Sequence, residues 1–186
     1  MKSLGFRAFV FFVVLALATL ACSSLSVDSL LNPMPTDDFS DSSSGWGTGT
    51  DTSSSVEYAD GGLKMSVYQT FYVTWSTPSA EVYENVHIEV SAINQSSDPQ
   101  AFYGIVCNEQ GTTSSFYYVG VTPEGYYAFI KSEAGLDDVY LKEGTSDAIA
   151  GAASGSMRIG LDCGNGSLVL YVNGQQIDSV ADATYT

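Results

Sequence analysis

Apolar and polar residues alternate along much of the chain, and this alternation predicts β-strands. In 86–92, Val86, Ile88 and Val90 fall on one face while His87 takes the other, as in a strand with one buried face. Similar short runs recur roughly every 8 to 15 residues, and no long stretch has the apolar stripe of a helix. The predicted strands are 56–59, 63–67, 71–75, 86–92, 101–107, 116–121, 126–131, 139–142, 157–163, 168–172 and 175–180. We therefore expect an all-β fold, an antiparallel β-sandwich of the jelly-roll type.

Glycine-rich turns separate several of these strands. Asp60-Gly61-Gly62, Gly164-Asn165-Gly166 and Asn173-Gly174 each stand between two apolar runs. Glycine and asparagine readily adopt the positive φ angles that tight hairpin turns require. Each of the three turns therefore predicts a β-hairpin.

The aromatic strands allow a prediction of which side chains face the core. Tyr117 and Val121 belong to the more apolar face of 116–121, which leaves Tyr118 pointing outward. In the next predicted strand, 126–131, the same argument places Tyr126 on the outward face, near Tyr118. A shift of one residue in register would exchange the two faces.

Residues 1–21 are typical of an export signal. Lys2 and Arg7 precede an uncharged, mostly apolar run over 8–21. This run is shorter than the roughly 20 residues that span a bilayer, but it has the length of the apolar region of a signal peptide.

Cys22 directly follows this run, in an arrangement that resembles the cleavage site of a bacterial lipoprotein signal. We therefore expect Cys22 to carry a lipid, 22–36 to be a polar tether, and 37–186 to form the folded domain. Ordinary cleavage after Ala18, which would leave Cys22 as a thiol, is the alternative. Either cleavage predicts an exported protein, and lipid on Cys22 would hold it at the cell membrane or cell surface.

Cys107 and Cys163 remain as an even pair in an oxidising compartment if Cys22 carries lipid. Both lie in predicted strands, so a disulfide between two neighbouring strands is expected. Two buried free thiols are the alternative.

The charge of the chain excludes one class of partner. It has 21 acidic and 6 basic residues and a net charge of -15. Nucleic-acid binding needs clustered Lys and Arg, which this sequence lacks. An acidic surface also repels anionic lipid headgroups, so membrane contact is expected through the lipid alone.

Several motifs resemble those of a known group of domains. They are Asp37-Asp38-Phe39 with Gly45-Trp46, Tyr103-Gly104-Ile105-Val106-Cys107, Phe116-Tyr117-Tyr118 with Gly125-Tyr126-Tyr127, and Leu168-Val169-Leu170-Tyr171-Val172-Asn173-Gly174. Together they resemble bacterial concanavalin A-like (laminin G-like) jelly rolls and are similar to domains related to the DUF1080, 3-keto-disaccharide hydrolase group. The resemblance covers roughly 37–186 and implies the fold more than the activity, because this fold serves lectins, hydrolases and spacers. Such domains usually continue past this hairpin with further strands, so truncation at Thr186 is a further expectation.

No catalytic residues are predicted. Glucanases of this fold carry a Glu-x-Asp-x-x-Glu pattern on one strand, and the spacing of Glu81, Glu84 and Glu89 does not fit it. A Gly-x-Ser-x-Gly motif is absent from the sequence, and a single histidine cannot build a three-histidine zinc site. No metal site is predicted either, although calcium is possible at acidic loops. The candidates for calcium are Asp37, Asp38, Asp41, Asp137 and Asp138, for which solvated surface acids are the alternative.

Aromatic side chains are the strongest indication of a ligand. Sugars present flat apolar C–H faces ringed by hydroxyl groups, which exposed rings with nearby polar groups can hold. The candidates are Trp75, Tyr118 and Tyr126, together with His87, which shares a strand face with Glu89. The alternative is that the rings fill the core and that His87 and Glu89 are simply solvated.

The sequence therefore predicts a surface-anchored, non-catalytic binding lipoprotein that recognises glycan or another extracellular ligand. A structural or adhesive spacer and a divergent glycoside hydrolase are the alternatives.

Overall fold

The computed structural model describes residues 36–78, 83–111 and 114–185. The expected signal peptide, Cys22 with its expected lipid, most of the expected tether and Glu81 lie outside the described residues.

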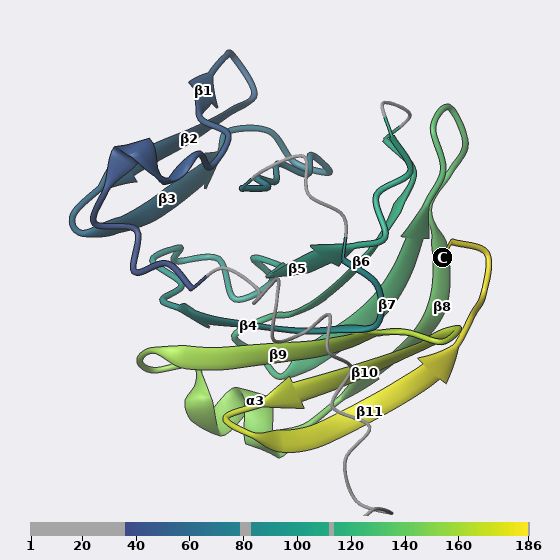
Figure 1. The fold of residues 1–186 in the computed structure, drawn as a ribbon. Coiled ribbons are helices and arrows are strands. Elements are labelled where there is room, and N and C mark those ends of the chain that lie inside the picture. Colours follow the sequence, from purple (N-terminus) through teal and green to yellow (C-terminus); the bar gives the residue numbers. More distant parts are fainter. Residues whose placement is uncertain (1–35, 79–82, 112–113, 186) are drawn as a thin grey trace, which may run out of the picture.

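Two four-stranded antiparallel sheets pack face to face (Figure 1). One has the order β11-β10-β9-β4 and the other the order β5-β6-β7-β8. The first contains β4 (Val86–Ala92), β9 (Met157–Gly164), β10 (Ser167–Val172) and β11 (Gln175–Ala181). The second contains β5 (Tyr103–Cys107), β6 (Phe116–Val121), β7 (Tyr126–Ser132) and β8 (Val139–Thr145). The prediction of an all-β, antiparallel β-sandwich is confirmed.

The core lies between the inner faces of these two sheets. From the second sheet it takes Tyr117, Val119, Val121, Tyr127 and Phe129, and from the first Met157, Ile159, Leu161, Leu168, Leu170 and Val172. Each fully buried side chain of this size stabilises the fold by roughly 1.5–3 kcal/mol relative to exposure. The inward orientation predicted for Tyr117 and Val121 is confirmed.

A disulfide joins Cys107 to Cys163, with the two Cα atoms 6.6 Å apart. The predicted pairing is confirmed, and the two strands belong to different sheets. Cys107 ends β5 and Cys163 lies on β9, so the bond crosses the core between the sheets. The alternation of apolar and polar residues along each strand indicates that both cysteines face inward. Which sheet each strand joins depends on pairing between distant parts of the chain.

A third, three-stranded sheet precedes the sandwich and stands apart from it in Figure 1. It consists of β1 (Gly49–Thr50), β2 (Ser54–Ala59) and β3 (Gly62–Val67), after a 3-10 turn, η1 (Ser42–Ser44). The predicted hairpin between β2 and β3 is confirmed. Asp60 and Gly61 have φ angles of 56° and 75°, as a tight turn between twisted strands requires.

Two local features differ from the sequence prediction. Residues 71–75 form no strand, because their apolar side chains find no partner strand and Phe71, Tyr72 and Val73 stay exposed. A short helix, α3 (Asp147–Ala152), connects β8 to β9 and begins with Ser146 as its cap. It is too short to produce the apolar stripe by which helices are detected.

Asp178 on β11 connects the two sheets of the sandwich at one side. Its carboxylate accepts hydrogen bonds from Nζ of Lys142 on β8 at 2.6 Å and from the hydroxyl of Tyr127 on β7 at 2.7 Å. These partners lower the pKa of Asp178. In return, the hydrogen bond to Asp178 and burial raise the pKa of Tyr127 to about 12.

We expect Asp178→Asn to lower the melting temperature at neutral pH and to make little difference in acid. A carboxyl group whose pKa is lower in the folded state stabilises the fold above its unfolded pKa of roughly 3.9, and this contribution is lost as the pH falls. Thermal melts from neutral pH to below the unfolded pKa measure the effect. Asp137→Asn, at an exposed site, is the control. Equal melting temperatures of Asp178→Asn and the wild type at neutral pH would contradict the prediction.

Candidate binding site

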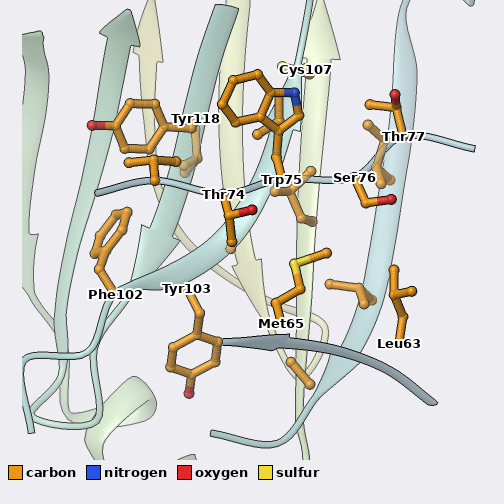
Figure 2. Close-up of a pocket in the computed structure, with 18 of the residues that line it drawn as sticks. Leu63, Met65, Thr74, Trp75, Ser76, Thr77, Phe102, Tyr103, Cys107 and Tyr118 are labelled. Atoms are coloured by element: carbon orange, nitrogen blue, oxygen red, sulfur yellow. The ribbon is translucent and has the colours of Figure 1, made fainter. Parts of the chain in front are cut away.

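A wide cleft of about 3140 Å³ separates the three-stranded sheet from the sandwich. Strand β3 and residues 68–78 line one side, and β4, β5 and parts of β6 line the other. Figure 2 shows the rings of Tyr118 and Phe102 together at the left of this pocket and Leu63 at the far right. Aromatic rings line both sides of the cleft: Tyr68, Phe71, Tyr72 and Trp75 on the first side and Phe102, Tyr103, Tyr118 and Tyr126 on the second.

Phe102, just before β5, lies at the centre of a group of rings on the sandwich side of the cleft. Its ring lies over Gly120 of β6, where an added Cβ would come within 2.8 Å of the ring. The ring meets that of Tyr118 edge-on at 6.2 Å and that of Tyr126 at a tilt and 6.5 Å. Gly120 thus lets three rings gather on the outer face of the sheet, and we call Phe102, Tyr118 and Tyr126 the aromatic platform.

Two carboxylates border the aromatic platform. The hydroxyl of Tyr118 donates to Asp138, and that of Tyr126 donates to Oε2 of Glu143 at 2.6 Å. Antiparallel pairing places Glu143 on the outer face opposite Ala128, which lies two residues after Tyr126 on β7. Both carboxyl groups belong to exposed residues.

Burial and these hydrogen bonds raise the pKa of both platform tyrosines well above the usual range. At physiological pH both hydroxyl groups are protonated, as in any tyrosine, and each donates to a carboxylate that orients it. Tyr140 of β8 is 57% exposed and also lines the cleft. The arrangement offers flat rings, hydroxyl groups and negatively charged acceptors on one surface.

Trp75 packs against this region from the segment that follows β3. Its ring lies 4.8 Å from that of Phe116. Phe116, Tyr118, Ala128 and Ile130 are buried there as a second, smaller apolar cluster. Tyr118 points away from the main core as predicted, but it is only 8% exposed, whereas Phe102 is 37% exposed.

His87 also lines the cleft, but it lies on β4, on the outer face of the other sheet of the sandwich. Its Nδ1 donates to Oδ1 of Asp162 at 2.6 Å, and the hydroxyl of Tyr171 donates to the other oxygen at 2.7 Å. Burial alone would raise the pKa of Asp162, but these two hydrogen bonds lower it. Glu89 lies 3.8 Å from Nε2 of His87 and 3.4 Å from Nε of Arg158.

The structure thus brings together three of the four ligand candidates from the sequence, Trp75, Tyr118 and Tyr126, and places His87 in a separate polar group. Sequence reasoning missed Phe102 and Glu143. The sequence contains only a weak signal for them. Gly120, a glycine within an aromatic strand, leaves space for the ring of Phe102. The position of Glu143 beside the platform depends on the register between β7 and β8.

The acidic residues considered for calcium lie in separate surroundings. Asp37 accepts hydrogen bonds from the backbone of Phe39 and from Nε1 of Trp46, and Asp41 caps η1. Asp38 accepts one from the backbone of Ser40. Across the described ranges, no three His, Cys, Asp or Glu side chains are grouped so as to hold a metal ion.

Within the part of the chain that the structure describes, no helix has the length and apolar character to cross a membrane.

Comparison with known proteins gives no assignment. No protein-family model matches the chain, and no curated protein is significantly similar to it. The resemblance to concanavalin A-like domains therefore stays a prediction.

Proposed function

We propose that the protein is a non-catalytic binding protein that recognises glycans in the cleft. The observation that carries this proposal is the aromatic platform, in which Phe102, Tyr118 and Tyr126 gather over Gly120 beside two carboxylates. The C–H face of a sugar ring can stack on such rings, while its hydroxyl groups can donate to carboxylate oxygens.

The opposite side of the cleft adds apolar surface for a ligand. Met65, Val67, Tyr72 and Val73 line the cleft and are all exposed. Contiguous exposed apolar surface in a folded protein commonly marks a binding site. A cleft of about 3140 Å³ suits an extended chain of sugars better than a small, enclosed ligand.

The proposal places the protein outside the cytoplasm, attached to a membrane through lipid on Cys22. The sequence of residues 1–22 motivates this location. The Cys107–Cys163 disulfide is in keeping with it, because disulfides persist mainly in oxidising compartments.

A thermal-shift assay of the full chain with a panel of soluble polysaccharides tests the proposal. A ligand at 100 times its dissociation constant adds about 2.7 kcal/mol to the free energy of unfolding, which raises the melting temperature by several degrees. Phe102→Ala is expected to weaken binding at least about fivefold, because it removes the central ring of the platform. Tyr126→Ala is expected to act in the same direction.

Leu136→Ala serves as the control, since Leu136 is exposed and does not line the cleft. It should leave both the melting temperature and glycan binding unchanged. Either a panel in which no polysaccharide binds or a Phe102→Ala variant that binds as well as wild type would refute the assignment.

A further inference from the structure

The cleft carries a strong negative charge. Nine carboxylate side chains line it, among them Asp138 but not Glu143, and Lys64 and His87 are the basic side chains among its described lining residues. None of the ion pairs among the described residues includes Asp138 or Glu143. The two carboxylates beside the aromatic platform are therefore not neutralised by a lysine or arginine of the described chain.

Other basic residues of the described chain have partners away from this site. Lys142 pairs with Asp178, and Arg158 pairs with Glu89. Lys131 donates to Thr184. These contacts hold Lys142, Arg158 and Lys131 away from the platform, and Lys64 lies on β3, on the other side of the cleft.

The platform itself has the chemistry of a cation site. The face of an aromatic ring attracts an ammonium group, and a nearby carboxylate adds a charge-assisted hydrogen bond. The hydroxyl of Tyr126 already fixes the position of Glu143, so its carboxylate is oriented before a ligand binds. Asp138 is fixed in the same way by Tyr118.

The geometry points to an amino-sugar polymer as the ligand, with protonated amino groups placed between the aromatic platform and the carboxylates of Asp138 and Glu143. This inference rests on the proposed glycan binding and names its chemical class. One sugar ring of the polymer stacks on Phe102, and its ammonium substituent lies against an acidic group at the border of the platform. A polyanionic glycan is repelled by the same charges.

Matched oligosaccharides of glucosamine, N-acetylglucosamine and glucose, of equal length and linkage, test the inference. They differ at one position of each sugar, which carries an ammonium, an acetamido or a hydroxyl group. Titration calorimetry of the full chain at mildly acidic pH, where the amino group is protonated, should show tightest binding for the glucosamine oligosaccharide. Added salt should weaken only this ligand, because it screens exposed charges.

Glu143→Gln removes the charge but keeps an oxygen that can accept the hydrogen bond of Tyr126. It should weaken binding of the glucosamine oligosaccharide about fivefold and leave the N-acetylglucosamine oligosaccharide unaffected. Asp138→Asn should act in the same way. Asp137→Asn, an equal change of charge at the neighbouring exposed position, is the matched control and should have a smaller effect.

Three outcomes overturn the inference, and they separate it from the proposed function. If the neutral oligosaccharides bind as tightly as the glucosamine one and Phe102→Ala weakens all of them, glycan binding stands and the amino-sugar class is wrong. If Glu143→Gln has no more effect than Asp137→Asn, the ammonium does not lie at the platform. If no oligosaccharide binds while an oligolysine peptide does, both the inference and the proposed function fall.

Discussion

Removal of the disulfide by replacing Cys107 and Cys163 with alanine is expected to lower the free energy of unfolding by about 4 kcal/mol. The bond closes a loop of 56 residues and restricts the unfolded chain accordingly. It also joins the facing sheets directly, since β5 and β9 share no backbone ladder. The melting temperature should fall by on the order of 10 °C.

Chemical denaturation of the oxidised wild type, the reduced wild type and the double-alanine variant measures this effect. Reduction should destabilise the wild type by a similar amount and should not change the variant, which has no bond at these positions. If oxidised and reduced wild type unfold at the same denaturant concentration, the bond contributes nothing to stability and the loop argument fails.

The alternation of residue types predicted the faces of the strands because successive side chains of a strand point to opposite sides. Tyr117 and Val121 pack in the core. Tyr118 and Tyr126 belong to the outer face of the same sheet. This property is local, so a single sequence is sufficient to reveal it.

Strand partners were not predictable in the same way. Residues 71–75 have the composition of a strand but no partner, because pairing depends on distant parts of the chain. The disulfide shows the same limit: the sequence indicated that Cys107 and Cys163 pair, but not that they stand in opposite sheets.

The candidate site was predictable only where it consists of aromatic residues on regular strands. Trp75, Tyr118 and Tyr126 could be named on that basis. Phe102 joins them because Gly120 leaves room for its ring, and Glu143 joins them because β7 and β8 pair with Ala128 opposite Glu143. Neither relation can be read from the residue types alone.

Phe129→Ala is expected to lower the free energy of unfolding by about 3–5 kcal/mol. Phe129 is 0% exposed on the inner face of β7, where its ring meets that of Tyr127 edge-on at 6.3 Å. Alanine would leave a cavity between sheets that the backbone ladders to β6 and β8 hold in place. Urea unfolding of the variant and the wild type gives this difference.

Phe129→Ala should mainly lower stability and Phe102→Ala should mainly weaken glycan binding, because the two rings lie on opposite faces of one sheet. At temperatures where it is still folded, Phe129→Ala should bind glycan nearly as well as the wild type, since Ala128 and Ile130 hold the outer face. Phe102→Ala should lose binding at a much smaller cost in stability, because its ring is partly exposed. If Phe129→Ala cost less than about 1 kcal/mol, the inner face would not be the close-packed core described above. If the folded Phe129→Ala variant did not bind glycan, the binding site would not be confined to the outer face of the sheet.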